Sequence, residues 1–285
     1  MELQTAYMKS LRAALKLLLE FSDEHPDQRV SDLANRTGLT KSHVSKLLSE
    51  FANAGLLIQN PVTRSYSVDQ ATFVLGTRFI NNDRLVHEST PIMRMLMDTT
   101  GHSARLSVLD KMRILYLLCI EGPLFVDTGI RTGTWLPLHS TSAGRVLLAF
   151  QETERIEVML GRSPLKKLTN KTVVDKKKLN QILASVRSNG YACQRGETTQ
   201  DLAAISAPVF GEHQKVLAAL TVATPTHLLT GDVEVALVGQ LQDAARGISL
   251  RMGCRVYPYG SADRGTAMYL RAIQKRAAGR VHKLY

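Results

Sequence analysis

Apolar residues recur at helical spacing in three stretches near the N-terminus of the chain, separated by short breaks. The first stretch, from Tyr7 to about Phe21, carries an apolar residue at every third or fourth position, which predicts an amphipathic helix. Pro26 ends this pattern, because proline cannot continue a helix and disfavours helical geometry at the preceding residue. Beyond that break, Ser31 and Gly38 predict the N-cap and the left-handed C-terminal residue of a short second helix.

The third apolar stretch predicts a helix that begins at Thr40, a residue type that caps helices well. Its apolar residues, from Val44 to Phe51, occupy the i, i+3, i+4 and i+7 positions of one buried stripe. The opposite face is short, polar and cationic, and it holds Lys41, Ser42, Ser45 and Lys46. Because lysine can contact phosphates or guanine and serine hydroxyls can reach base edges, this face suits the major groove of DNA.

Two short stretches after this helix, 56–59 and 65–68, predict the strands of a hairpin. Turn-forming residues join them, which places Arg64 near the tip of a wing. An apolar stripe alone is most often core, and a Ser/Lys face alone is most often solvated. The order helix, short helix, glycine turn, helix and hairpin nevertheless favours a winged helix-turn-helix DNA-binding domain over residues 1–68.

The pattern after residue 68 changes from helices to strands and predicts a second domain. Residues 69–100 predict two linker helices, interrupted near 81–83 and at Pro91, and the first of them is expected to couple the two domains. A C-terminal domain is predicted over residues 101–252. Its expected elements are strands at 104–109, 113–120 and 216–224 and a closing amphipathic helix at 231–250.

The formal net charge of +11 indicates an anionic partner, but this charge is unevenly placed. Residues 1–68 hold eight Lys and Arg against seven Asp and Glu, whereas residues 258–285 hold six against one. Within the predicted DNA-binding domain, the window 29–68 is locally basic. The C-terminal tail, 253–285, is most simply a flexible basic segment, and nonspecific attraction to DNA phosphates is the alternative.

Several classes of protein are disfavoured by what the sequence lacks. No apolar run approaches the ~18 residues that span a bilayer, and the N-terminus lacks the apolar core of a signal peptide, which predicts a cytoplasmic protein. The three cysteines are too widely spaced for a disulfide framework or a zinc motif, and the histidines show no HExxH spacing. No metal and no cofactor are therefore predicted. An enzyme or redox sensor remains the alternative, resting on Cys193 with Arg195 as its cationic neighbour.

The segment Trp135–Phe150 carries the most specific chemistry of the second domain. A loop that ends at a Ser/Thr cap leads into Ala143–Gly144 and then into an apolar helix. Backbone N–H groups at such a helix N-terminus are free, and the helix dipole there favours an anion or a carbonyl oxygen. Because the small residues allow close approach, this segment is the first candidate for a ligand site.

Three segments resemble one known family, the IclR-type transcription regulators. Residues Arg36–Leu57 are similar to the recognition segment of these regulators. The Leu-Pro-Leu-His run at 136–139, followed by Gly144, resembles the first signature of their effector domain, and residues 190–210 resemble the second. The resemblance extends over about residues 5 to 250.

The resemblance implies an α/β two-domain chain with an N-terminal winged helix-turn-helix and a C-terminal GAF/profilin-like α+β effector-binding domain. It implies a regulator rather than an enzyme, which binds a double-stranded DNA operator under the control of a small metabolite, often an organic acid. A homodimer that reads two half-sites is expected, and pairing of dimers into a homotetramer stays open. The residues expected to contact DNA are Arg36, Thr40, Lys41, Ser42, Ser45, Lys46 and Arg64.

Alignment with the family also implies a set of effector-binding residues: Ser142, Ala143, Gln194, Ala204, Thr221 and Ala223. Ser142 and Thr221 are expected to hydrogen-bond a ligand oxygen, and the alanines to shape the pocket. The alternative is that Ser142 only caps its helix, Thr221 is only a β-branched strand residue and the alanines only pack. The chain departs from the family at three of the expected positions. Members commonly have Pro in place of Thr40, Arg in place of Lys46 and an acidic residue in place of Gln194.

Overall fold

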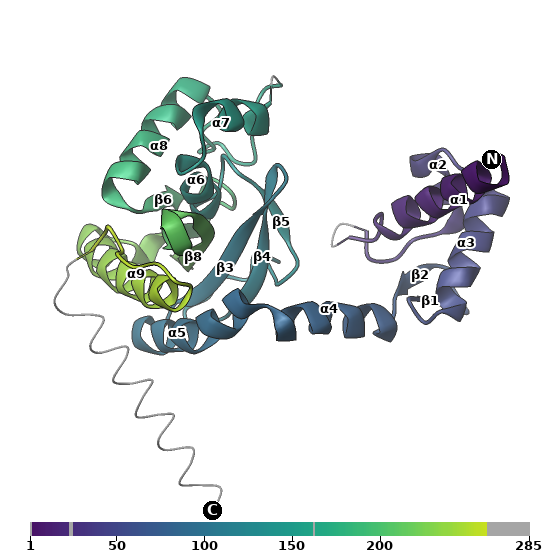
Figure 1. The fold of residues 1–285 in the computed structure, drawn as a ribbon, viewed down its shortest axis with the longest axis horizontal. Helices are drawn as coiled ribbons and strands as arrows, with labels where there is room; N and C mark the ends of the chain where they lie inside the picture. Colours follow the sequence, from purple (N-terminus) through teal and green to yellow (C-terminus); the bar gives the residue numbers. More distant parts are fainter. Residues whose placement is uncertain (1, 23–24, 162, 261–285) are drawn as a thin grey trace, which may run out of the picture. The chain divides into compact units, whose positions relative to one another are not determined.

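The computed structural model describes residues 2–22, 25–161 and 163–260, with side chains from residue 8 onward. The chain forms two compact units, of which the first ends at Asn82 and the second begins at Asp83 (Figure 1). The side chain of Tyr7 and the predicted tail residues 261–285 lie outside the described residues.

The first unit has the predicted order of helices and hairpin. Its elements are α1 (Glu2–Leu18), α2 (Val30–Thr37), α3 (Lys41–Asn53), β1 (Leu57–Gln59), β2 (Tyr66–Val68) and α4 (Gln70–Asn82). Side chains from the first three helices and from both strands meet in one apolar core: Leu17, Leu33, Val44, Leu48, Leu57 and Tyr66. The stripe predicted on the third helix is therefore the face that packs the winged helix-turn-helix together.

The start of α2 differs from the sequence expectation. Arg29 is the N-cap residue and makes no side-chain cap, while Ser31 lies inside the first turn and donates its hydroxyl to Asp32, with Oγ and Oδ1 3.2 Å apart. The reason lies in the preceding residue, because Gln28 and Tyr66 exchange backbone hydrogen bonds of 2.8 and 2.7 Å. This bridge fixes the backbone just before the helix and lets it begin two residues earlier than the cap preference indicates.

The linker consists of two helices, and the break between them lies where the sequence predicts it. Asp83 caps α5 (Arg84–Thr100) by accepting a hydrogen bond from the backbone N–H of Val86. Pro91, in contrast, lies inside α5 and does not interrupt it. The helix loses one backbone hydrogen bond there, but it buries apolar side chains on both sides of the proline, including Val86 and Met93, and this packing holds it together.

The second unit is built on one antiparallel sheet of six strands in the order β5-β4-β3-β8-β7-β6. Its strands are β3 (Ser103–Asp110), β4 (Arg113–Ile120), β5 (Trp135–Pro137), β6 (Ala192–Arg195), β7 (Leu202–Phe210) and β8 (Val216–Pro225). Its helices are α5, α6 (Ser142–Ala149), α7 (Thr153–Leu160), α8 (Lys176–Asn189) and α9 (Gly231–Arg251), with short 3₁₀ turns at Glu212–Gln214 and Thr226–Leu228. This is the predicted α+β arrangement.

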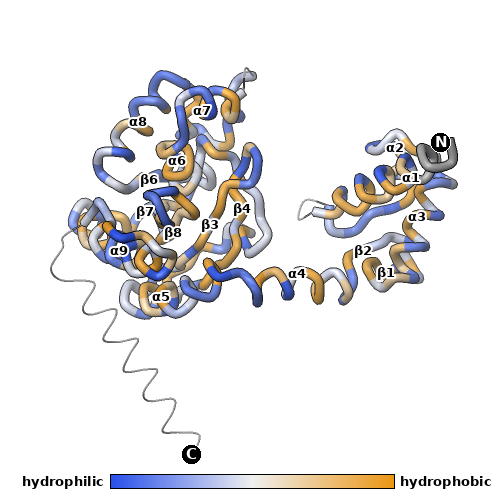
Figure 2. Tube along the Cα trace, viewed as in Figure 1, coloured by the Kyte–Doolittle hydropathy of each residue, from blue (hydrophilic) through white to orange (hydrophobic). Residues whose placement is uncertain are grey.

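Helices cover the sheet of the second unit in two groups (Figure 1). α5 and α9 pack on each other and on β3, β4, β7 and β8, whereas α6 packs against β6, β7 and β8 and is covered in turn by α8. Figure 2 shows the result as apolar colour along the central strands and polar colour on the outward side of α8. Every residue of β7 is buried, so any polar side chain on this strand needs a partner inside the protein.

Residues 253–260, which follow α9, differ from the flexible tail that the sequence predicts from residue 253. Cys254 and Tyr257 are buried, and the hydroxyl of Tyr257 donates to the carbonyl of Pro208 at 3.0 Å. The hydroxyl of Tyr259 donates to the carbonyl of Arg187 at 2.7 Å, and its ring lies against Gly190. Aromatic packing on the sheet therefore fixes this segment.

Candidate functional site

The outward face of α3 is formed as the sequence predicts. The hydroxyl of Thr40 caps the helix by accepting a hydrogen bond from the N–H of His43 at 3.3 Å. Val44 and Leu48 are buried, which turns the other side of the helix to solvent. This exposed side holds Lys41, Ser42, Ser45 and Lys46. The structure therefore gathers these four residues on one helix face, and their contact with DNA stays a prediction.

The wing lies beside this helix face. Asn60 shapes its turn, because its side-chain oxygen accepts hydrogen bonds from the N–H groups of Val62 and Thr63 at 2.9 and 3.1 Å. Arg64 has a φ of 60° and is exposed at the end of the turn. A groove of about 580 Å³ runs between α2, α3 and the wing, and both Ser45 and Arg64 line it.

Two further arginines of the first unit bear on the predicted DNA-contacting set. Arg29 lines the same groove as Arg64 and is exposed, although the sequence pattern did not mark it. Its signal was its place directly before the second helix, where a side chain can reach a backbone phosphate. Arg36 is exposed, and its guanidinium pairs with the carboxylate of Glu20, at 3.3 Å, and donates to the side-chain oxygen of Gln28; its contact with DNA stays a prediction.

The second unit contains a small polar cavity between the sheet and the N-terminus of α6. Four of the six expected effector-binding residues line it: Ser142, Gln194, Ala204 and Thr221. Four further polar or aromatic residues that the sequence did not mark also line it: Arg105, Tyr116, Thr141 and Thr198. Side chains fill most of the space, and the cavity volume is about 10 Å³, close to what one water molecule needs.

Ala143 and Ala223 do not line this cavity. Both are almost fully buried and belong to the apolar core between α6, α8 and the sheet. For these two residues the structure agrees with the alternative that they pack rather than touch a ligand.

The floor of the cavity is a polar row that crosses neighbouring strands. Arg105 on β3 lies directly opposite Thr221 on β8, and Thr221 lies directly opposite Ser206 on β7. The hydroxyl oxygens of Thr221 and Ser206 are 2.7 Å apart, and Ser206 donates to the hydroxyl of Ser142 at 2.8 Å. Ser142 is the first residue of α6, capped by Thr141, so the row ends at a helix N-terminus.

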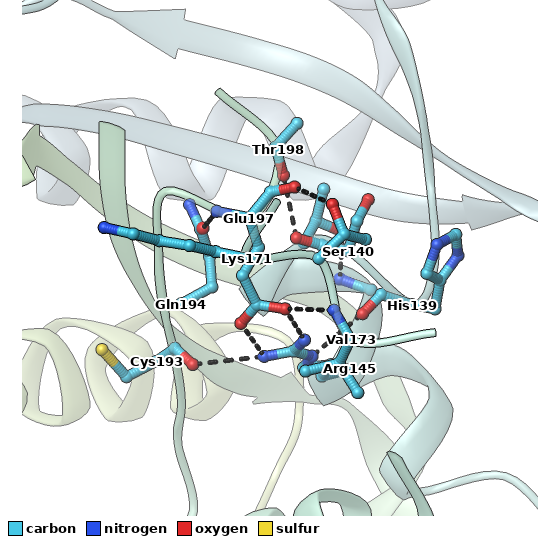
Figure 3. Close-up of polar contacts among 12 residues, drawn as sticks. His139, Ser140, Arg145, Lys171, Val173, Cys193, Gln194, Glu197 and Thr198 are labelled. Carbon is cyan, nitrogen blue, oxygen red and sulfur yellow. Dashed lines mark hydrogen bonds and ion pairs between the residues drawn. The ribbon is translucent and has the colours of Figure 1, made fainter. Parts of the chain in front are cut away.

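Beside the cavity, a buried ion pair holds the loop between β6 and β7 (Figure 3). Two nitrogens of the Arg145 guanidinium donate hydrogen bonds to the carboxylate of Glu197. Nη1 lies 2.8 Å from Oε1, and Nη2 donates to Oε2. The backbone N–H of Glu197 donates to the side-chain oxygen of Gln194 at 2.9 Å. The side chain of Gln194 therefore stabilises this loop, and its amide oxygen, Oε1, already accepts a hydrogen bond.

The environment of Cys193, on which the redox alternative rests, disfavours the reactive thiolate form. Burial raises the pKa of the Cys193 thiol to about 12, with a further contribution from the nearby carboxylate of Glu234, although Arg195 lowers it. Because the thiolate is the reactive form, a thiol that stays protonated near neutral pH is a poor nucleophile. The structure therefore does not favour Cys193 as a redox centre.

Two further surveys cover the described part of the chain. Within residues 2–22, 25–161 and 163–260, no three His, Cys, Asp or Glu side chains gather in a way that could hold a metal ion. No helix in these ranges combines the length and the apolar character that crossing a membrane requires.

Comparison with known sequences identifies both units. The sequence model of the IclR helix-turn-helix domain matches residues 10–61, and that of the bacterial transcriptional regulator IclR C-terminal domain matches residues 77–250. The HTH-type transcriptional regulator KdgR of Dickeya chrysanthemi is 30% identical over 252 residues, covering 88% of this chain and 83% of that protein. These matches are to transcription regulators and not to enzymes.

Solved structures show the same fold. An IclR transcriptional regulator from Silicibacter sp. TM1040 aligns with a TM-score of 0.76 and 26% identity, covering 89% of this chain and all of that one. An IclR homolog from Microbacterium hydrocarbonoxydans, solved in complex with 4-hydroxybenzoate, aligns with a TM-score of 0.73 and 24% identity, covering 85% and 98% of the two chains.

Proposed function

This chain belongs to the IclR family of bacterial transcription regulators, and from that premise we propose that a small organic acid controls its affinity for an operator. The protein acts in the cytoplasm as a homodimer, whose two winged helix-turn-helix units read two half-sites. The acid binds in the cavity beneath α6. The observation that carries this proposal is the buried polar row of that cavity, which ends at a helix N-terminus where an anion is favoured.

The DNA contacts come from α3 and the wing. Lys41 and Lys46 supply phosphate or guanine contacts, and Ser42 and Ser45 are short enough to reach base edges without filling the groove. Arg64 and Arg29 both line the groove beside α3 and contact the phosphate backbone of the flanking DNA. Arg36 is exposed beside these residues and contacts a phosphate, while its bonds to Glu20 and Gln28 hold α2 in place.

Dimerisation is supported by the surface of α4. Among the described residues this helix buries none, and its large apolar side chains are exposed by 71% at Phe73, 61% at Leu75 and 54% at Phe79. A helix that is apolar on several sides needs a cover, and a second copy of the chain supplies one. The hydroxyl of Thr72 donates to the carbonyl of Leu56 at 3.0 Å, which ties this helix to the wing hairpin. α4 therefore transmits a change in dimer geometry to the DNA-contacting elements.

The DNA-binding part is tested by first selecting a duplex from a random pool with the full chain. The double variant Lys41→Ala/Ser45→Ala is then compared with the unchanged chain in a gel-shift titration. Losing these contacts from both half-sites is expected to weaken binding by at least about 30-fold. The control is Lys177→Ala/Ser188→Ala, which removes the same residue types from exposed positions on α8. Unchanged binding by the first variant would falsify the role of α3.

The effector part is tested with the same selected duplex. Small organic acids (acetate, pyruvate and benzoate) and their neutral amides are added to the complex at increasing concentration. A shift in the midpoint of the DNA titration with any of these compounds supports control by a small molecule. No shift with any of them contradicts it, while leaving the DNA-binding part intact.

A further inference from the structure

Arg105 is an unusual residue to find in the interior of the second unit. Its side chain is 2% exposed, and it lies in the middle strand pair of the sheet, opposite Thr221. It lines the same cavity as Ser142 and Thr221. A buried guanidinium costs free energy unless its charge and its N–H groups are matched by partners, so its partners decide what the residue does.

The partners of Arg105 inside the chain do not match it fully. The nearer carboxylate oxygen of Glu121, Oε1, lies 3.7 Å from Nη2, which is beyond hydrogen-bond distance, and among the described residues it meets no hydrogen-bond donor. The other oxygen, Oε2, accepts from the hydroxyl of Ser103 at 2.6 Å. The ring of Tyr116 lies under the guanidinium, with its centroid 6.0 Å from Cζ. Among the described residues, no acceptor meets the buried Nε of Arg105.

The opposite wall of the cavity offers matching donors. A hydroxyl has one hydrogen to donate. Because Ser206 gives its hydrogen to Ser142, the bond between Thr221 and Ser206 is donated by Thr221. The hydrogen of Ser142 itself is then left for a further acceptor. The N–H groups of Ser142 and Ala143 belong to the first turn of α6 and have no acceptor within the helix.

We propose that Arg105 is the residue that selects the charge of the effector, and that it does so by forming a bidentate pair with a carboxylate. This inference rests on the proposed effector site and deepens it. One oxygen of the carboxylate pairs with Nε of Arg105, the other with an Nη, and the hydroxyl of Ser142 donates to one of them. The apolar part of the walls, which includes Ile130, Leu136 and Leu202, receives the body of the molecule.

The charge and volume of the cavity narrow the ligand further. A single guanidinium balances one negative charge, and its planar fork matches a carboxylate. The cavity of about 10 Å³ holds no organic acid without movement of its walls. The effector is therefore a small monocarboxylic acid, and its binding displaces side chains at the N-terminus of α6.

The test measures binding of acids and amides to the full chain by isothermal titration calorimetry, with acetate, pyruvate and benzoate as the acids. The single tryptophan, Trp135, is next to the lining residue Leu136 and gives a second readout by fluorescence. At least one acid is expected to bind more tightly than its amide, by at least about 30-fold, because a buried charge partner is worth that much. If no acid binds more tightly than its amide, the proposal is overturned.

Variants then assign the preference to Arg105. Arg105→Gln removes the positive charge of the guanidinium. The double variant Arg105→Met/Glu121→Gln removes this charge and also the negative charge of Glu121, which would otherwise be left unpaired. Both are expected to lose the preference for acid over amide, and the double variant covers the case in which the single one fails to fold. The control, Arg113→Gln, removes an exposed arginine from the neighbouring strand and keeps the preference. Tight acid binding by the double variant overturns the proposal.

Failure of this inference is distinguishable from failure of the proposed function. If an amide binds as well as its acid and still shifts the DNA titration, control by a small molecule stands and the role of Arg105 falls. If the unchanged chain selects no duplex, the regulator function itself fails, whatever Arg105 does.

Discussion

The two polar surfaces of this chain are built in opposite ways. On α3 the polar side chains point to solvent. Removing the side chains of Lys41 and Ser45 would therefore leave the fold unchanged. In the cavity beneath α6 the polar side chains are buried and bond to one another, as Thr221, Ser206 and Ser142 do. The first surface is ready for a partner as large as DNA, whereas the second must be reorganised before a small molecule can enter.

Because of this difference, the residues expected to bind DNA contribute little to the stability of the first unit, whereas the residues expected to bind the effector also stabilise the second unit. An exposed lysine can be removed at little cost in folding free energy, because water solvates its neighbours. A buried charge or hydroxyl leaves an unmatched partner when it is removed. Substitutions in the cavity should therefore change stability and effector response together, whereas substitutions on the exposed face of α3 should change DNA binding alone.

The largest expected effect follows from breaking the buried pair beside the cavity. In Arg145→Met the carboxylate of Glu197 keeps the N–H of Val173, at 3.1 Å, but loses both contacts to the guanidinium. An uncompensated buried charge of this kind lowers the free energy of unfolding by about 3–5 kcal/mol. Urea denaturation of the full chain, followed by circular dichroism, measures it.

Two controls show whether burial is the cause. Arg131→Met breaks a pair of similar length with Asp127, 2.8 Å, in which both side chains are more than half exposed, and the unfolding curve should not change measurably. Arg145→Met/Glu197→Gln removes both charges and should recover part of the loss. Equal losses from the buried and the exposed pair would contradict the contrast between the two environments.

An exposed apolar residue of the first unit sharpens the contrast from the other side. Phe79→Asp adds a charge at an exposed position of α4, a helix that buries none of its residues within the described chain, so the fold of each unit should be unaffected. The proposed homodimer should dissociate, and affinity for the selected duplex should fall by about 100-fold, or roughly 2.7 kcal/mol, because half-sites then bind independently. Sedimentation velocity and gel-shift titration measure the two effects.

The control for this prediction is a phenylalanine of similar exposure in the second unit. Phe125, in the loop after β4, is 47% exposed against 54% for Phe79. Phe125→Asp should leave the dimer and the affinity for DNA unchanged. A dimer that survives Phe79→Asp would show that α4 is covered by something other than a second copy of the chain.

The same contrast explains which features the sequence could predict. The α3 face is local: Thr40 caps it, Val44 and Leu48 set its buried side, and the exposed residues follow from the helical period. The boundary at Asp83 is local too. The helix break predicted at Pro91 is wrong, because the tertiary packing of α5 outweighs the loss of one helical hydrogen bond.

The cavity could be predicted only in part, because its residues are brought together by strand order. Arg105 is far in sequence from Ser142 and Thr221. The pairing of β3 with β8 places Arg105 opposite Thr221, and the packing of α6 on these strands brings Ser142 to the same cavity. In the sequence Arg105 is a charged residue between the apolar Ala104 and Leu106 of a predicted strand, and this is the signal available for it. Of the effector-binding residues that the family alignment implies, Ser142 and Thr221 line the cavity, whereas Ala143 and Ala223 pack in the core. Contact of Ser142 and Thr221 with a ligand stays a prediction.

The smallest expected effect tests a single hydroxyl in that buried row. Thr221→Val keeps the shape and the β-branching of the side chain and removes only its hydrogen bond to Ser206, which is 2.7 Å long. The free energy of unfolding should fall by about 1–2 kcal/mol, because a buried hydroxyl loses its donor. The midpoint shift that an acid causes in the DNA titration should also shrink, since Ser206 then no longer orients its hydrogen toward Ser142.

The same strand supplies the control for this change. Thr224 on β8 is 1% exposed, and among the described residues its hydroxyl meets no hydrogen-bond partner. Thr224→Val therefore removes a group whose burial is uncompensated and should leave stability unchanged or raise it slightly. If the two substitutions have the same effect on unfolding and on the acid response, the polar row is only core packing. If only Thr221→Val lowers the free energy of unfolding and reduces the acid response, the hydroxyl of Thr221 serves the ligand site. Its β-branched shape is then not the reason for the residue, because valine would supply that shape equally well.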